Sequence, residues 1–139
     1  FVKTTGGKGL HIVSPLKPKA GWEEMKEFAR AIADSMESDN PDLFIAKASK
    51  AQRKGKIFVD YLRNSRGATA IAPYSSRARS GATVSMPLSW DELDPSIRSA
   101  HFSVTNAVAR MVNLTSDPWG DFRNAQVPLE TKRKGTRRR

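Results

Sequence analysis

The segment from Gly21 to Ser38 is the one long stretch of this chain in which apolar residues repeat with a helical period. A long amphipathic helix needs an apolar surface to pack on, so it limits the folds that the remaining residues can adopt. Its apolar side chains recur at spacings of three and four: Trp22, Met25, Phe28, Ala29, Ile32 and Met36. One face of the predicted helix is therefore apolar, and Pro41 follows its end. A helix of this kind is expected to cover one face of a sheet.

The segments around this helix show the short apolar alternation of β-strands. Residues 2–4 and 10–16 are predicted to form a hairpin around the glycine-rich turn 5–9. Further strands are predicted at 56–62, 68–72 and 102–105, and shorter helices at 45–54, 90–93 and 107–112. Because strands and helices do not alternate in a regular repeat, the pattern predicts an α+β fold with a largely antiparallel sheet flanked by helices.

Length and composition narrow the class of protein further. We expect residues 1–130 of the 139 to form part of one domain, followed by a basic disordered tail or linker at 131–139. The chain has no cysteine, no signal peptide and no apolar stretch of the ~20 residues that a membrane helix needs, which fits a cytoplasmic protein without a membrane partner. Because Phe1 stands within a predicted strand, we expect the chain to begin inside a larger domain.

The net charge of +10 is unevenly distributed along the chain. Between Lys47 and Arg79 there are nine basic residues and one acid, whereas Trp22 to Asp42 holds seven acids and two basic residues. A basic block is typical of a surface that meets phosphate, since the release of counterions favours such binding. The pattern therefore favours a nucleic acid or a nucleotide as ligand, with a solvated basic surface as the alternative.

The single acid of the basic block is Asp60, near the end of the predicted strand 56–62. A carboxylate at a strand end is suited to hold Mg²⁺ or Mn²⁺, although a salt bridge to a neighbouring arginine explains its position equally well. Arg63 shares a site with Asp60 only if the chain turns after Leu62, which the residues at 64–67 predict. A guanidinium at that place is able to bind phosphate oxygens in pairs.

The glycine-rich turn is the second candidate site. Its glycines permit a close approach of the backbone to a ligand, and the amides of such a turn are able to cradle an anion. Lys8 adds a positive charge, and His11 begins the next strand pointing back toward the turn. The spacing matches neither the phosphate-binding P-loop nor the dinucleotide fingerprint, and a simple hairpin turn is the alternative.

Five segments occur in the order and spacing of a known family. They are Phe1–His11, Gly55–Asn64, Ala68–Ser75 with Arg77–Arg79, Pro87–Leu93 and Asp117–Trp119. In these segments the chain resembles the polymerase domain of bacterial ligase D, a member of the archaeo-eukaryotic primase superfamily, and only the tail falls outside the match. The resemblance implies the C-terminal half of a primase-polymerase fold.

The resemblance also implies roles for particular residues. Asp60 matches the third catalytic carboxylate, a metal ligand. The residues that match the nucleotide-binding positions are Thr5, Lys8, His11, Arg63 and Arg77. The implied reaction is two-metal nucleotidyl transfer with Mn²⁺ (or Mg²⁺), which adds nucleotides, preferentially ribonucleotides, to primer 3′ ends during DNA double-strand break repair.

The implied partners are DNA ends presented as primer-template, nucleoside triphosphates and the upstream half of the polymerase domain. A ligase domain and the end-binding protein Ku are further implied partners, and the implied location is the bacterial nucleoid.

One feature of the family has no counterpart in this chain. The family's Asp-x-Asp pair, which supplies most of the metal coordination, is absent, since the sequence contains no such motif. One carboxylate does not offset the repulsion between two divalent ions, so we expect the chain alone to be inactive or nearly so. Two alternatives are a non-catalytic module that binds nucleic acid or nucleotides and a fragment that self-associates through open sheet surface.

Overall fold

The computed structural model describes residues 1–129, and the predicted tail at 131–139 lies outside the described residues. The chain divides into two compact units. Unit 1 consists of Phe1–Leu16 and Ile71–Val127, and unit 2 of Lys17–Ala70 with residues 128–129. Among the described residues, no helix combines the length and the apolar character needed to cross a membrane.

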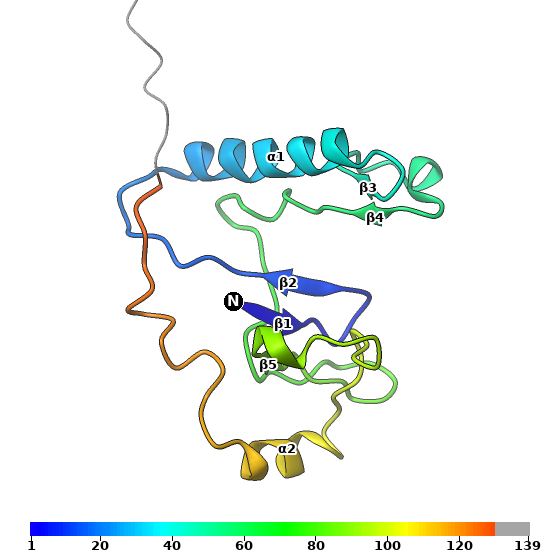
Figure 1. Ribbon diagram of the computed structural model, residues 1–139, viewed down its shortest axis with the longest axis vertical. Helices are drawn as coiled ribbons and strands as arrows, with labels where there is room; N and C mark the ends of the chain where they lie inside the picture. The colour runs from blue at the N-terminus through cyan, green and yellow to red at the C-terminus, as the bar shows by residue number, and fades with distance from the viewer. Residues whose placement is uncertain (130–139) are drawn as a thin grey trace, which may run out of the picture. The chain divides into compact units, whose positions relative to one another are not determined.

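Unit 1 is built on a three-stranded antiparallel sheet with the order β2-β1-β5 (Figure 1). The strands are β1 (Val2–Thr4), β2 (Leu10–Ile12) and β5 (Pro87–Leu88). Lys3 lies opposite His11 on one side and opposite Pro87 on the other. The predicted hairpin and the antiparallel α+β fold are therefore confirmed. β2 is shorter than the predicted segment 10–16, because β1 begins at Val2 and leaves the later residues without a long partner strand.

The core of unit 1 lies on the face of β1 that carries Val2. This side chain is fully buried and belongs to a cluster of apolar residues from well-separated parts of the chain: Val2, Val84, Met86, Leu88 and Phe102. Alternation along β1 sends Lys3 to the opposite face of the sheet. Because Val2 must face the core, Lys3 must face the other side of the sheet.

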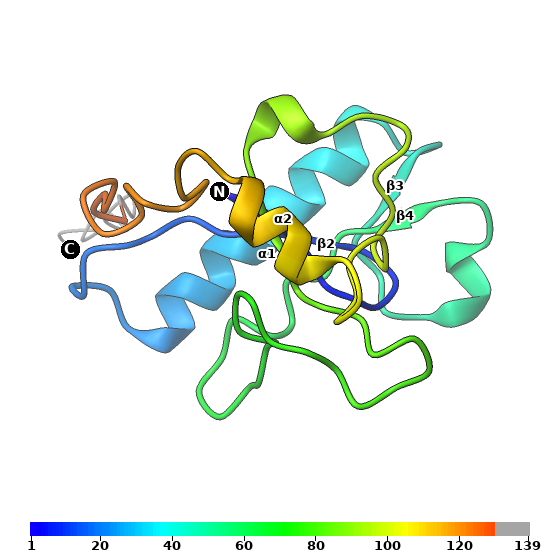
Figure 2. The same cartoon turned by 90° about the horizontal axis from the view of Figure 1, so that it is seen from below.

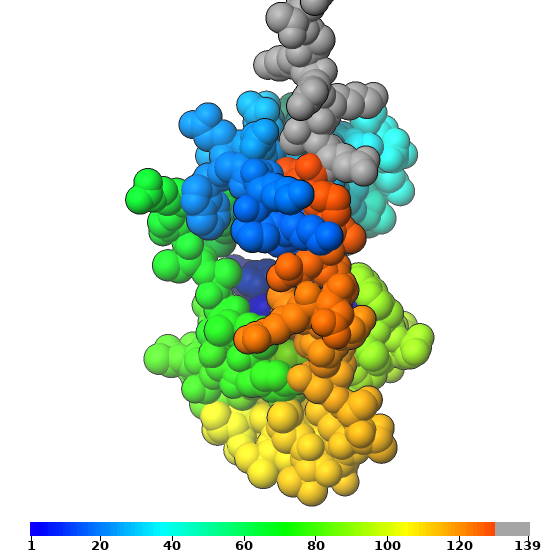
Figure 3. All heavy atoms as spheres, turned by 90° about the vertical axis from the view of Figure 1, so that its left-hand side faces the viewer, coloured from blue at the N-terminus to red at the C-terminus, as the bar shows by residue number. Residues whose placement is uncertain are grey.

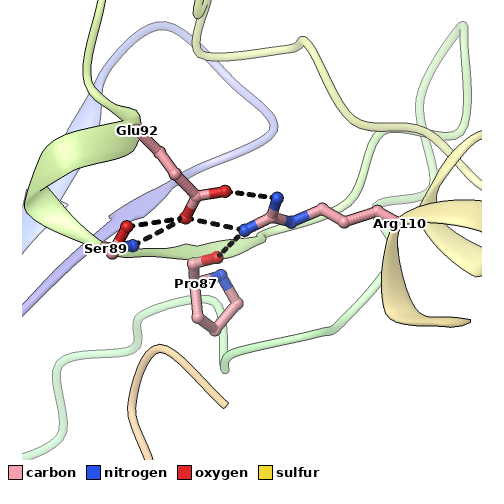
Figure 4. A network of polar contacts seen from close by, with 4 residues as sticks. All are labelled: Pro87, Ser89, Glu92 and Arg110. Carbon is pink, nitrogen blue, oxygen red and sulfur yellow. Dashed lines mark hydrogen bonds and ion pairs between the residues drawn. The ribbon is translucent and has the colours of Figure 1, made fainter. Parts of the chain in front are cut away.

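An ion pair ties the two short helices of unit 1 together. The 3₁₀-helix η2 (Trp90–Glu92) is followed by α2 (Ala107–Asn113), which lies in front in the view of Figure 2. Arg110 of α2 donates hydrogen bonds to both oxygens of the Glu92 carboxylate and to the carbonyl of Pro87, 3.2 Å away (Figure 4). The same carboxylate accepts from the backbone N–H of Ser89 at 2.8 Å. The predicted helices at 90–93 and 107–112 are confirmed, the first as η2 and the second as α2.

Residues 114–127 run along the surface of unit 1 and appear in orange in Figure 3. Trp119 stacks on Phe122 with 5.2 Å between ring centroids, and both rings meet Phe1 edge-on. The indole N–H of Trp119 donates to the carbonyl of Val2 at 2.9 Å. This end of unit 1 is therefore anchored to the first strand.

Unit 2 contains the long helix α1 (Trp22–Asp39) and two strands, β3 (Phe44–Ile45) and β4 (Ile57–Phe58), which pair in parallel. The predicted helix at 21–38 is confirmed, and the Glu24 carboxylate caps the N–H of Gly21 at 2.8 Å. Ala33 is the buried residue of α1.

Four local predictions were wrong in whole or in part. The predicted helix at 45–54 begins instead with β3, which pairs with β4, and continues as the short 3₁₀-helix η1 (Lys50–Arg53). The predicted strand at 56–62 extends only over β4, because β3 offers two residues for pairing. The segments 68–72 and 102–105 form no strand in the part of the chain that the structure describes, apart from an isolated bridge at Ser103.

Candidate functional site

The glycine-rich turn of unit 1 is closed around the side chain of Thr5. The Thr5 hydroxyl donates to the carbonyl of Gly9 at 2.7 Å and accepts from the backbone N–H of Gly7 at 3.1 Å. The N–H of Gly9 points to the same oxygen at 3.4 Å. Thr5 is 7% exposed, so this small hydroxyl is a buried hub that fixes the path of the turn.

Glycine is required at position 6 of the turn. Gly6 has a φ of +62°, and a Cβ there would lie 2.9 Å from the hydroxyl of Thr83. Backbone conformation and steric space therefore both exclude a larger residue. A Cβ at Gly9 would meet open space instead, so Gly9 is the tolerant position of the turn.

The carbonyl groups of the turn are held by side chains from the second half of unit 1. Arg77 donates to the carbonyl of Thr5 at 3.2 Å, and Arg79 to that of Gly6 at 3.3 Å. The hydroxyls that complete this set are those of Thr83, 2.5 Å from the Gly6 carbonyl, and Ser99, 2.8 Å from the Gly7 carbonyl. These donors fix the carbonyls in place and bring two guanidinium groups to the turn.

Two backbone amides of the turn differ in exposure, since Gly6 is buried and Lys8 is exposed. Within the described residues, the N–H groups of Gly6 and Lys8 donate no hydrogen bond. Arg77 and Arg79 each retain further N–H donors, since a guanidinium carries five. These two amides, the two guanidinium groups and the exposed side chain of Lys8 are groups that are able to bind an anion with several oxygens.

Two further basic residues share a face of the sheet next to the turn. His11 of β2 is half-buried and lies directly opposite Lys3 of β1. Lys3 is 3% exposed, and its ammonium donates to the Ser85 hydroxyl at 2.7 Å and to the Ile71 carbonyl at 2.8 Å. Burial, together with the nearby Arg77 guanidinium, lowers the pKa of Lys3 from 10.5 to about 8.

Asp60 and Arg63 lie in unit 2, in the turn that follows β4. The Asp60 carboxylate is exposed and accepts from the N–H of Leu62 at 3.0 Å. The N–H of Asn64 donates to the carbonyl of Tyr61, so the chain turns here as the sequence predicts. The Arg63 guanidinium donates to the carbonyl of Thr69 at 2.8 Å.

The alternative explanation for Asp60, a salt bridge to an arginine, is not found among the described residues, where the ion pairs are Arg30–Asp34 and Glu92–Arg110. The described residues also contain no group of three or more His, Asp or Glu side chains arranged to hold a metal ion. A divalent ion such as Mn²⁺ takes about six oxygen ligands. Asp60 therefore fits the role of a single ligand but does not form a metal centre by itself.

The predicted site residues thus fall into two groups. The structure brings Thr5, Arg77 and the turn that carries Lys8 together in unit 1, with His11 in the adjacent strand. Asp60 and Arg63 form the group in unit 2. Sequence reasoning missed the supporting residues Lys3, Arg79, Thr83 and Ser99. Two of them had a local signal: Lys3 is a cation inside a short predicted strand, and Arg79 belongs to the basic block and to the matching segment Arg77–Arg79.

Comparison with known proteins shows the family to which this chain belongs. A family model described as the LigD primase-polymerase domain matches residues 1–119. The multifunctional non-homologous end joining protein LigD of Pseudomonas aeruginosa is 45% identical over 123 residues, which cover 88% of this chain and 15% of that protein. The bifunctional non-homologous end joining protein LigD of Bacillus subtilis is 34% identical over 128 residues, which cover 91% of this chain and 21% of that protein.

A solved structure shows the same fold. The polymerase domain from Mycobacterium tuberculosis ligase D, determined in complex with DNA, superimposes with a TM-score of 0.81 at 34% sequence identity. The match covers 91% of this chain and 44% of that one. This chain therefore spans less than half of the solved domain and a small part of the full-length relatives.

Proposed function

Since this chain belongs to the LigD primase-polymerase domain family, we propose that it is part of a bacterial end-joining polymerase. In this proposal it contributes to the addition of nucleotides, preferentially ribonucleotides, to primer 3′ ends at broken DNA. The observation that carries the proposal is the glycine-rich turn, in which backbone amides and two guanidinium groups converge. The triphosphate of an incoming nucleotide is the anion that fits both the turn and the family.

Each predicted residue of unit 1 has a distinct task in binding that triphosphate. Thr5 holds the turn in shape, and Arg77 retains N–H donors for phosphate oxygens while one bonds the Thr5 carbonyl. Lys8 stands exposed within the turn and supplies charge. His11, which lies opposite Lys3 on the same sheet, is proposed to contact a phosphate oxygen.

Asp60 and Arg63 are proposed to act from unit 2. Asp60 would supply one carboxylate ligand to Mn²⁺ (or Mg²⁺), and Arg63 would contact the triphosphate. When bound, the metal provides charge stabilisation for the attacking and leaving oxygens of phosphoryl transfer. The other acidic ligands have to come from the part of the domain that this chain does not span.

The proposed partners follow from the same family membership. The solved relative was determined in complex with DNA, which supports DNA ends as the substrate of this chain's domain. The upstream half of the polymerase domain is proposed as the partner that completes the fold, since the chain matches 44% of the solved domain. A ligase domain and Ku are proposed as partners of the complete protein.

Primer extension tests this proposal. We expect the chain alone, with Mn²⁺ and ribonucleotides, to extend a primer at or near the background level. Joined to the upstream half of the polymerase domain from the P. aeruginosa relative, it is expected to extend the primer and to prefer ribonucleotides over deoxyribonucleotides. A joined protein that folds, binds DNA and yet adds no nucleotide would contradict the proposal.

A non-catalytic module that binds nucleic acid or nucleotides is the second candidate function. It is favoured by the basic block and by the lack of an acidic metal-binding cluster among the described residues. The two functions differ in what they require of Asp60. A binding module tolerates Asp60→Asn or binds phosphate slightly better, because a negative charge is removed.

A further inference from the structure

Lys3 is a buried cation that no carboxylate balances within the described residues. The residue is 3% exposed, and both hydrogen-bond acceptors of its ammonium, the Ser85 hydroxyl and the Ile71 carbonyl, are neutral. The ion pairs in this part of the chain involve other residues. A buried ammonium is normally paired with an acid, because burial without a counter-charge is costly.

The charged groups around Lys3 add further positive charge to that of its unpaired ammonium. Arg77 lies close enough to destabilise the ammonium, and His11 stands directly opposite on β2. The neighbour on β5 is Pro87, which carries no charge. The amino group of Phe1, the residue before β1, donates to the carbonyl of Val13. Arg77 is therefore the charged neighbour that acts on the Lys3 ammonium, whereas Tyr74, whose backbone N–H donates to the Ser85 carbonyl, is neutral because burial raises its pKa to about 12.

Lys3 is also joined to the turn by a chain of hydrogen bonds. Its ammonium donates to the Ser85 hydroxyl, which in turn donates to the carbonyl of Thr4 at 2.9 Å. Thr4 precedes Thr5, whose side chain closes the turn and whose carbonyl accepts from Arg77. The buried ammonium is thus linked to the glycine-rich turn through Ser85 and the backbone of Thr4.

We propose that Lys3 is a positioning residue of the nucleotide site, whose buried charge, uncompensated by protein carboxylates, favours the polyphosphate bound by Arg77 and the glycine-rich turn. The inference rests on the proposed function, since it takes that anion to be a nucleoside triphosphate. The bound polyphosphate supplies the negative charge that no protein carboxylate provides near Lys3. Lys3 and Arg77 then both face an anion instead of repelling each other.

A linkage between protons and nucleotide follows. The pKa of Lys3 is about 8 in the free protein, and a nearby anion raises it. Below pH 8 the ammonium is charged in both states, and nucleotide affinity does not depend on its titration. Above pH 8 the free protein loses this proton and the complex retains it, so affinity falls as pH rises.

Calorimetric titration with ATP, without added metal ions, measures this linkage. From pH 7 to pH 9.5 the affinity of the wild-type chain is expected to fall about tenfold, with uptake of a proton on binding at the upper end. Lys3→Met is expected to bind about tenfold more weakly at pH 7 and to show no such fall. Lys3→Arg keeps the charge without titrating in this range, so it should bind tightly at both pH values.

The variants retain His11, the Phe1 amino group and the basic tail, so the difference from the wild type isolates Lys3. Circular dichroism at each pH establishes that a variant is folded before its affinity is compared. An equal fall in wild type and Lys3→Met overturns the role of Lys3 but leaves the nucleotide site in place. Failure of the wild-type chain to bind ATP overturns both the inference and the nucleotide site.

Discussion

At the scale of single residues, the shape of the glycine-rich turn depends on the hydroxyl groups of Thr5 and Thr83 and on the absence of a side chain at Gly6. Thr5 holds three backbone groups of the turn with a single hydroxyl, and Thr83 occupies the space that any side chain at Gly6 would need. Local sequence predicts the turn and its glycines. It does not predict Thr83 or Ser99, because these donors come from residues more than seventy positions away.

The two outer glycines of the turn provide a matched pair of variants. Gly6→Ala forces a Cβ into a backbone conformation with φ of +62° and against the Thr83 hydroxyl, whereas Gly9→Ala meets open space. We expect Gly6→Ala to lose about 1–3 kcal/mol of stability and at least tenfold in ATP affinity. Gly9→Ala should remain close to the wild type in both. Thermal unfolding measures the stability, and titration with ATP measures the affinity. If Gly6→Ala and Gly9→Ala changed both quantities equally, the claim that ATP binding depends on the shape of the turn would be contradicted.

At the scale of secondary-structure elements, the sequence predicts the periodic helices and the hairpin correctly. It also predicts strands in segments that find no partner strand and therefore do not form one. The helix at 22–39, the hairpin and the helix at 107–113 follow from local repeats and caps. The apolar alternation at 68–72 predicts a strand, but the Ile71 carbonyl accepts from the Lys3 ammonium instead of from a neighbouring strand. A strand needs a partner, and the sequence alone does not show whether one is present.

The contact between η2 and α2 depends on one carboxylate. The Arg110 hydrogen bonds, helped by those of Ser89, lower the pKa of Glu92 below its usual value of 4.5. A lowered pKa means that this contribution to stability is complete above pH 4.5 and is lost as pH falls through the pKa of the folded state. We expect Glu92→Gln to cost about 1–2 kcal/mol at pH 7.

Urea unfolding at several pH values tests this prediction. The difference in unfolding free energy between the wild type and Glu92→Gln should shrink as pH falls below 4.5. Asp91→Asn, at the exposed neighbouring position in η2, is the control and should change stability by less than about 0.5 kcal/mol. A difference that stays constant down to acid pH would show that the Arg110 contact does not depend on the Glu92 charge.

At the scale of the whole molecule, the fold class and the family are readable from the sequence, and the division into units is not. The ordered motifs between Phe1 and Trp119 identify the family that the matching domain model shows. The predicted site residues nevertheless divide between two compact units, with Asp60 and Arg63 in one and the glycine-rich turn in the other. That division arises from long-range contacts, which local periodicity does not record.

The most direct test of the proposed polymerase function is primer extension by the chain joined to the upstream half of the P. aeruginosa polymerase domain, with and without Asp60→Ala. We predict that this variant loses at least about a hundredfold in Mn²⁺-dependent extension, because a metal-ligand carboxylate is removed. Asp42→Ala, another exposed acid of unit 2, should extend primers like the unmodified joined protein. Equal extension by Asp60→Ala and Asp42→Ala would contradict the assignment of Asp60 and favour a module that only binds.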